Sequence, residues 1–480
     1  MTLNHDQLPA LTVQNLVAGR YVGGGTPTEF FSPYDGVKVG GVELATPEIA
    51  HEAVTGAANA AKIMKKMPPR ERAKFLKKAS EILTDRAESI AKTMCLETGK
   101  ALRDTRVELA RAADVVSFCA DEAVRIEGRH ISLEGSAVGQ GKLAIALPVP
   151  IGVVLGIVPF NAPVNLACHK IAPALAAGNS IIIKAPPQAP KTLDMLARIF
   201  LDAGTPPEAL SVIHGDADVG DALVEDPRVN YLSFTGSHKV GLEIKKKAGT
   251  RGCLLELGGL GPVIVHKDAD LEKAAKMCCS AGFRLAGQSC ASVQNLFVHN
   301  DVWDSFKERF LAHVTQLKLG DPMDPETDLG PVIDDRAAER IEASISGAVS
   351  TGAQVLLGGR RDGRMIEPTV IMDATPDMDI IKNEIFGPVV VLRRFDDLDD
   401  PINWIGETGQ GINCGVFTDS NQVALKAAVE ISCAAVIING TCTFRPEQFP
   451  YGGTGKSGYG RESPRDSILA MTQERILVFA

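Results

Sequence analysis

The 480-residue sequence contains no C-x-x-C pair, no H-E-x-x-H motif and no low-complexity tract. The first two absences remove the spacings typical of a dithiol redox centre and of a zinc protease. We also recognise no secretion signal, so we expect a cytoplasmic protein with reduced thiols, most of them small core residues. The ten cysteines are scattered along the chain, at positions 95, 119, 168, 253, 278, 279, 290, 414, 433 and 442.

Basic residues are in deficit, and the chain has no uninterrupted hydrophobic span. The formal net charge is −9 and the pI about 5.6, which disfavours nucleic acid and anionic membranes as partners. The stretch Leu143–Cys168 has no charged side chain, but it holds prolines at 148, 150, 159 and 163. Four prolines are incompatible with one spanning helix, and the stretch predicts strand, turn and strand.

What the chain does have is a regular alternation of apolar strands and helices. From about residue 153 to 257, short apolar runs such as "GVVLGIV", "SIIIKA", "LSVIHG", "VNYLSFTGS" and "GCLLELGG" alternate with helical stretches. Continuous apolar strands joined by helices indicate a parallel sheet covered on both faces. The predicted fold is therefore α/β, with a doubly wound dinucleotide-binding domain.

A second α/β pattern starts at about Leu271, beyond the glycine-rich stretch 258–261. The length of the chain agrees with two or three domains. We predict a dinucleotide-binding domain from 1–127 and 151–257, a catalytic domain from 258–454, and a small β element for oligomerisation from 128–150 and 455–480.

In a doubly wound sheet, ligands bind beyond the carboxyl ends of the strands. The motifs "PFN", "KAP", "HGD", "FTGS" and "ELGG" all fall at those ends. We therefore expect these turns to form one ligand site.

Three residues near these turns combine into a candidate catalytic set. Cys290 lies between small polar residues in "GQSCASVQN", in a loop ahead of a predicted strand, and is a candidate nucleophile. Glu256 ends an apolar strand, where burial would raise its pKa and make it a base; a structural Glu–Arg pair is the alternative. Asn161, between two prolines, could hold an oxyanion; an ordinary turn asparagine is the alternative.

One glycine-rich segment invites a nucleotide interpretation that we reject. "GTGKSG", residues 453–458, matches G-x-G-x-x-G and resembles part of a P-loop. The P-loop pattern needs glycine at position 450, which is Pro450, and no apolar strand leads directly into the segment. We predict an ordinary glycine-rich turn.

Taken together, the motifs resemble those of the aldehyde dehydrogenase superfamily in order and approximate spacing. The resemblance covers nearly the whole chain and rests on "PFNAP", "FTGS", "LLELGG", "GQSC", "EIFGPVV" and "PYGGTGKSGYGRE".

The resemblance implies an NAD(P)-dependent oxidation of an aldehyde to a carboxylic acid. Cys290 would attack the carbonyl to form a thiohemiacetal, with Asn161 and the Cys290 backbone N–H holding the oxyanion. Hydride transfer to nicotinamide would leave a thioester, and Glu256 would activate the water that hydrolyses it. No metal is required.

The cofactor residues implied by the resemblance lie in the same motifs: Phe160, Lys184, Gly215, Gly236, Ser237, Leu257, Glu384 and Phe386. One position departs from many NAD-using members, which have a glutamate three residues after the lysine; here it is Pro187. Because that carboxylate binds the ribose and repels a 2′-phosphate, the choice between NAD and NADP stays open.

The substrate is less well defined by the sequence. Arg103, Arg106, Arg284 and Arg445 lie in segments that, by the resemblance, border the aldehyde tunnel. One or two of them could bind the anionic tail of a small aldehyde; surface arginines in salt bridges are the alternative.

The ribbon "ISLEGSAVGQGKLAIALPVP" and the tail "ERILVFA" resemble the family's oligomerisation elements, so we expect a homodimer or homotetramer. Two alternatives for function remain. A CoA-acylating semialdehyde dehydrogenase generally lacks a base at the position of Glu256. A non-catalytic binding protein of the same fold would be expected to lose Cys290, Glu256 or Asn161.

Overall fold

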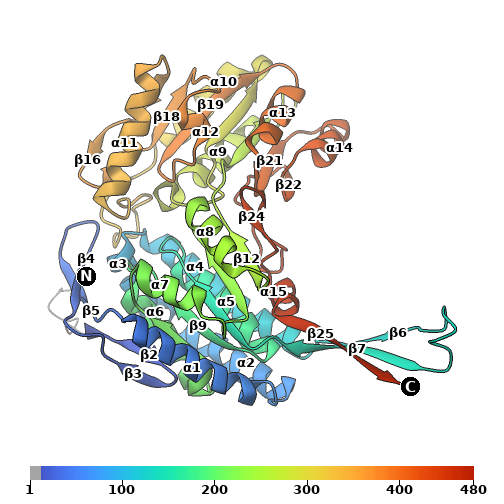
Figure 1. Ribbon diagram of the computed structural model, residues 1–480. Coiled ribbons are helices and arrows are strands. Elements are labelled where there is room, and N and C mark those ends of the chain that lie inside the picture. Colours follow the sequence, from blue (N-terminus) through green and yellow to red (C-terminus); the bar gives the residue numbers. More distant parts are fainter. Residues whose placement is uncertain (1–11) are drawn as a thin grey trace.

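Two α/β bodies and a projecting β-ribbon make up the computed structural model (Figure 1), which describes residues 12–480. Residues 1–11 of the predicted first domain therefore lie outside the described residues. Each body has its own central sheet, so the expectation of an α/β fold with a parallel dinucleotide-binding sheet is confirmed.

The first sheet has eight strands in the order β24-β12-β11-β8-β9-β10-β2-β3. Its five central strands are parallel, and their order reverses between β8 and β11, which makes that junction the switch point of a doubly wound sheet. The antiparallel strands β24, β2 and β3 lie at the edges. The bounds are β2 Asn15–Val17, β3 Arg20–Val22, β8 Val153–Ile157, β9 Ser180–Lys184, β10 Leu210–Ile213, β11 Tyr231–Thr235, β12 Gly252–Glu256 and β24 Gly458–Tyr459.

Side chains of these strands alternate between two hydrophobic cores, because successive residues of a strand point to opposite faces. Val154 belongs to one core, and its neighbours Val153 and Leu155 belong to the other. Helices α1, α7 and α8 cover one face, and α2 to α6 with α15 cover the other. Their bounds are α1 Pro47–Met64, α2 Pro69–Asp85, α3 Ala87–Thr98, α4 Leu102–Ala123, α5 Pro163–Ala177, α6 Pro190–Asp202, α7 Ala217–Glu225, α8 His238–Ala248 and α15 Pro464–Ala470.

The second sheet has seven strands in the order β15-β18-β19-β14-β13-β21-β22, and only β15 runs antiparallel to its neighbour. The strand bounds are β13 Pro262–Val265, β14 Asn295–His299, β15 Gln354–Leu357, β18 Thr369–Met372, β19 Val389–Phe395, β21 Asn413–Phe417 and β22 Ala435–Ile438. The helices around it are α9 Leu271–Phe283, α10 Trp303–Val314, α11 Asp335–Ser350, α12 Asp379–Lys382, α13 Asp399–Thr408 and α14 Asn421–Glu430.

The chain passes between the two bodies twice. It leaves the first sheet at the end of β12 and enters the second at β13. After β22 it returns to β24, which pairs antiparallel with β12 through Leu255–Tyr459 and Glu256–Gly458. The segment "GTGKSG" contains β23 (Thr454–Gly455), a turn at Lys456 and Ser457, and the first residue of β24, so the predicted glycine-rich turn is confirmed.

The ribbon consists of β6 (Arg129–Ile131), β7 (Leu143–Pro150) and β25 (Thr472–Phe479), and it projects away from the first body (Figure 1). β25 pairs with all of β7, from Thr472–Pro150 to Phe479–Leu143. The strand, turn and strand predicted for the uncharged stretch are β7 and β8. Across residues 12–480, no helix combines the length and the hydropathy that a membrane crossing needs.

Candidate active site

A cavity of about 440 Å³ lies at the switch point of the first sheet. Pro159 to Ala162 follow β8, Thr235 to Ser237 end and follow β11, and Glu256 to Gly258 end and follow β12. Residues 289–291 close the cavity from the second body. The cavity is therefore built where the rule for doubly wound sheets places a ligand.

The loop that carries Cys290 begins with an unusual backbone. Leu285, Ala286 and Gly287 are consecutive residues with positive φ, at 58°, 51° and 69°. A side chain at Gly287 would be strained and would also meet a neighbouring backbone, because a Cβ there would lie 1.9 Å from the carbonyl oxygen of Gly387. This backward turn after α9 brings Cys290 to the cavity instead of continuing the helix.

Cys290 lies in the cavity wall, in surroundings that favour the neutral thiol over the thiolate. Burial raises the pKa of Cys290 to about 11, and the carboxylates of Glu384 and Glu256 add to that effect. A hydrogen bond with Tyr451, whose Oη lies 3.1 Å from Sγ, acts in the opposite direction.

Glu256 ends β12 and is 3% exposed. Neither carboxylate oxygen has a hydrogen-bond partner among the described residues. Burial raises the pKa of Glu256 well above its usual value, and the nearby Glu462 carboxylate raises it further. A buried carboxyl group without a structural partner is suited to proton exchange with a ligand or a water, and the Glu–Arg pair considered from the sequence is not formed.

Asn161 faces the same cavity from the turn after β8. Its Nδ2 donates to the carbonyl of Gln288 at 3.0 Å, which ties it to the loop two residues before the cysteine. One N–H of the amide is thereby used, and the other is the donor left for an oxyanion. Its Oδ1 is buried and lacks a partner within the described part of the chain.

Six of the eight predicted cofactor residues line the cavity, and two do not. Lys184 ends β9 and Gly215 follows β10, so both lie along the same edge of the sheet but outside the cavity wall. Burial lowers the pKa of Lys184, and Asp216 opposes that shift. Pro187 is exposed in the turn after β9. The six in the wall are Phe160, Gly236, Ser237, Leu257, Glu384 and Phe386.

The residues present fit a dinucleotide. Ser237 caps α8 by accepting a hydrogen bond from Val240 N, so the positive end of that helix faces the cavity and can receive a pyrophosphate. Glu384 accepts from the backbone of Gly259, yet its buried Oε1 has no partner in residues 12–480, as expected of an acceptor for ribose hydroxyls. Burial raises the pKa of Glu384 to about 7.

The four candidate substrate arginines separate into two pairs. Arg103 and Arg106 lie outside the cavity wall and form ion pairs with Asp328 and Glu88, respectively, so for them the structure favours the surface salt bridge. Arg284 and Arg445 line the cavity. Arg445 is already paired with Glu462, with Nη2 and Oε2 2.8 Å apart.

Arg284 differs from the other three because its guanidinium has no hydrogen-bond or ion-pair partner in the described chain. It is only partly buried, at the cavity wall between α9 and the cysteine loop. A cation without such a partner, in the wall of the cavity that also holds Cys290, is a ready binding group for an anion.

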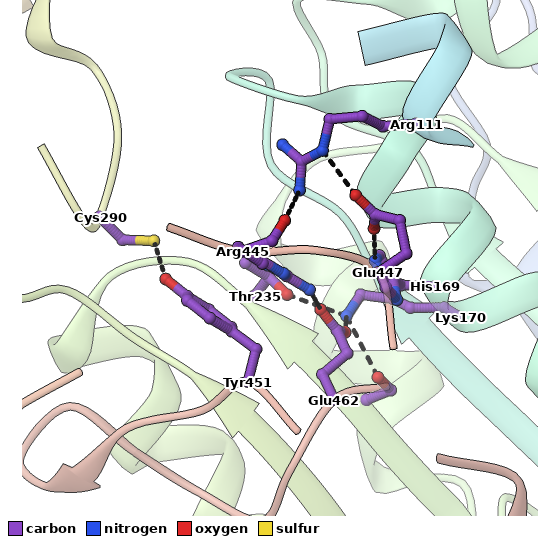
Figure 2. Close-up of polar contacts among 10 residues, drawn as sticks. Arg111, His169, Lys170, Thr235, Cys290, Arg445, Glu447, Tyr451 and Glu462 are labelled. Carbon is purple, nitrogen blue, oxygen red and sulfur yellow. Dashed lines mark hydrogen bonds and ion pairs between the residues drawn. The ribbon is translucent and has the colours of Figure 1, made fainter. Parts of the chain in front are cut away.

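Residues of a buried charge network were not predicted from the sequence (Figure 2). Lys170 is fully buried in α5 and bonds Ser233, Thr235 and Glu462. Arg111 bonds Glu447 and the carbonyl of Arg445. A lysine inside the otherwise uncharged helix "VNLACHKIAPALAA" was a usable sign, because buried lysines are rare unless they are paired. The residues that complete the network are His169, Glu447, Tyr451 and Glu462.

A cysteine, a carboxamide and a buried carboxyl group thus lie around one cavity at the switch point of a doubly wound sheet, as the resemblance to aldehyde dehydrogenases leads us to expect. The chain belongs to the aldehyde dehydrogenase family, whose profile matches residues 21–477. It is an NAD(P)-dependent aldehyde dehydrogenase, as the family resemblance predicted.

Similar proteins include enzymes with anionic substrates. A 3-sulfolactaldehyde dehydrogenase of Priestia aryabhattai is 40% identical over 466 residues, which cover 96% of this chain and 97% of that one. A sulfoacetaldehyde dehydrogenase of Neptuniibacter caesariensis is 35% identical over 408 residues, 85% of this chain and 90% of the other. The crystal structure of the NADP-dependent glyceraldehyde-3-phosphate dehydrogenase of Bacillus halodurans C-125, complexed with NADP, is 34% identical with a TM-score of 0.95, and covers 98% and 99% of the two chains.

Proposed function

We propose that this enzyme oxidises a small anionic aldehyde to its carboxylic acid, with Cys290 as nucleophile, Asn161 as oxyanion donor and Glu256 as base. The observation that carries the proposal is the shared cavity, whose wall holds these three side chains and the guanidinium of Arg284, which has no ion-pair partner among residues 12–480.

Each residue has one task in this scheme. The Cys290 thiolate bonds to the aldehyde carbon, and the free N–H of Asn161 with the Cys290 backbone N–H holds the resulting oxyanion. Bound NAD or NADP supplies the acceptor for the hydride that leaves this carbon. Glu256 then takes a proton from a water, whose oxygen attacks the thioester and releases the acid and the thiol.

Arg284 would bind the tail of the substrate. Three other cations of the wall are already paired with carboxylates: Arg445 with Glu462, Arg111 with Glu447 and Lys100 with Glu108. The remaining one, Arg340, donates to the backbone carbonyl of Ile385. The relatives that act on sulfonated and phosphorylated aldehydes support a tail of the same charge.

Arg284→Met tests this assignment. We measure NAD(P)H absorbance at 340 nm with each dinucleotide, for a sulfonated, a phosphorylated and a carboxylated aldehyde of two to four carbons, and for neutral aldehydes of equal size. Loss of one charge-assisted contact should lower kcat/KM for the preferred anionic aldehyde about 10- to 100-fold and leave the neutral ones nearly unchanged.

Arg106→Met is the matched control, because Arg106 is exposed and paired with Glu88; its kcat/KM should stay at the wild-type value. If the wild-type enzyme used a neutral aldehyde of matching size equally well or better, the anionic preference would be rejected. Production of an acyl-CoA when CoA is added would favour the acylating alternative over hydrolysis by Glu256.

We also propose a homo-oligomer and a reducing, cytoplasmic setting. Both faces of β25 are open to solvent, with Ile476, Leu477, Val478 and Phe479 between 43% and 55% exposed, and an apolar strand of this kind is stabilised by covering it. All ten cysteines are free, which agrees with reduced thiols.

A further inference from the structure

The side chain that touches the Cys290 sulfur has no part in the chemistry described above. Tyr451 is 2% exposed, and its Oη lies 3.1 Å from Sγ, with either atom able to donate. It comes from the segment between β22 and β23, far from the cysteine in sequence, and Figure 2 shows its hydroxyl directed at the thiol.

The tyrosine ring is held in place from two sides. The guanidinium carbon of Arg445 lies 3.9 Å from the ring centroid, and Arg445 is itself fixed by Glu462. The backbones of Tyr451 and Glu462 exchange hydrogen bonds of 3.2 and 2.6 Å, and Lys170 anchors the Glu462 carboxylate at 3.1 Å. A cation over the ring face strengthens the hydroxyl as a donor, because it stabilises negative charge on the phenol oxygen.

The charges that face Cys290 otherwise disfavour a thiolate. Carboxyl groups approach from two elements, Glu256 at the end of β12 and Glu384 ahead of β19, and the one cation with a marked influence is Arg445. Burial and these two carboxyl groups raise the pKa of the thiol, and the value of about 11 already includes the opposing effects of the Tyr451 hydrogen bond and of Arg445. The ionisable groups elsewhere in the cavity wall are Lys100, Glu108, Arg111, Arg284 and Arg340.

We propose that the Tyr451 hydroxyl donates its hydrogen bond to the Cys290 sulfur and stabilises the thiolate, so that Tyr451 is a catalytic residue of this enzyme. The thiol proton passes to solvent, and the tyrosine keeps its own proton throughout. When the sulfur bonds to the aldehyde carbon it loses its negative charge, and the contact weakens. The proposal rests on Cys290 being the nucleophile.

The test uses the free enzyme, with no aldehyde. Tyr451→Phe keeps the ring under Arg445 and removes only the donor. A hydrogen bond to a charged group corresponds to about one pH unit or more in the pKa of Cys290. The thiolate absorbance at 240 nm is titrated from about pH 8 to 11.5, with the Cys290→Ser variant of each protein as its own baseline, and the rise should come about one pH unit higher in Tyr451→Phe.

Alkylation by iodoacetamide gives a second readout, followed on the Cys290 peptide by mass spectrometry. At a pH below the pKa, a one-unit rise in the pKa of Cys290 lowers the amount of thiolate about tenfold. The remaining thiolate is intrinsically more nucleophilic, so the rate of alkylation should fall only about threefold. Tyr459→Phe is the control, because Tyr459 is 58% exposed on β24; it should leave both values unchanged.

Unchanged thiolate absorbance and alkylation rate in Tyr451→Phe would overturn the proposal and leave the tyrosine a packing role. Should that variant fail to fold, 3-fluorotyrosine at position 451 replaces it: a more acidic phenol is a stronger donor and should raise the thiolate absorbance, whereas a fall or no change contradicts the proposal. Failure of the proposed function would be seen separately, as absence of aldehyde oxidation by a wild-type enzyme whose thiol titrates as described.

Discussion

Glu256 lowers the stability of the folded protein when it is ionised, because its buried carboxyl group has no hydrogen-bond partner among the described residues. That cost is understandable if the group works as a base. Its raised pKa means that the ionised, proton-accepting form becomes more abundant as the pH rises toward that pKa. An ordinary exposed carboxylate would already be fully ionised and a poorer proton acceptor near neutral pH.

Glu256→Gln should therefore separate the two halves of the reaction. Without the base, the thioester on Cys290 forms but is hydrolysed slowly, so rapid mixing should show a burst of about one NAD(P)H per active site. The steady-state rate should fall about 100- to 10,000-fold and lose its rise with pH. Loss of the burst together with the steady state would instead place Glu256 in the first half of the reaction.

The residues that the sequence could not resolve are those whose partners are distant along the chain. Asp328, which neutralises Arg103, is 225 positions away, and Tyr451 lies 161 positions after the cysteine it contacts. Local context is enough to single out Cys290, Asn161 and Glu256 as candidates, since each stands beside a strand end or in a small-residue loop. Local context cannot tell an arginine such as Arg284, which has no partner in the part of the chain that the structure describes, from a paired one.

At the scale of elements, the strand-to-turn junctions were predictable because continuous apolar runs end sharply in polar or glycine residues. The turn between α9 and Cys290 was not, because Leu285 and Ala286 adopt positive φ without being glycine or asparagine. Contacts from both bodies hold them there, because Ala286 packs in a core of the second body and the Leu285 N–H donates to Asp104 of α4. Isolated L-residues in this region cost about 1–2 kcal/mol each.

Gly287→Ala should damage this turn specifically. The added Cβ meets the Gly387 carbonyl, and displacing the cysteine loop by about 1 Å should lower kcat about 100-fold. Gly347→Ala is the control, because Gly347 is in α11 and a Cβ there meets nothing within 4 Å; it should be neutral or stabilise by about 0.5–1 kcal/mol. Thermal melts and steady-state kinetics measure both effects, and a fully active Gly287→Ala enzyme would show that the turn tolerates rearrangement.

At the scale of the whole molecule, the ribbon is the part that the first body does not cover. Introducing two charges on one face of β25, Ile476→Glu with Val478→Glu, should dissociate the oligomer, because each buried carboxylate would be left without a partner. Light scattering at micromolar concentration should show an oligomer for the wild type and a monomer for the variant. Val349→Glu, on an exposed position of α11, should leave the mass unchanged; a monomeric wild type would refute the expectation.

Because the chain passes between the two bodies twice, the parts of the first sheet are synthesised at widely separated times. The second sheet is inserted between β12 and β24, neighbours in one sheet that are about 200 residues apart in sequence. A ribosome therefore completes all the remaining strands of the first sheet well before it reaches β24 and Glu462. Until then the nascent chain carries Lys170 without its counter-ion and Cys290 without its tyrosine, so the thiol environment proposed here is assembled only as translation of the last elements is completed.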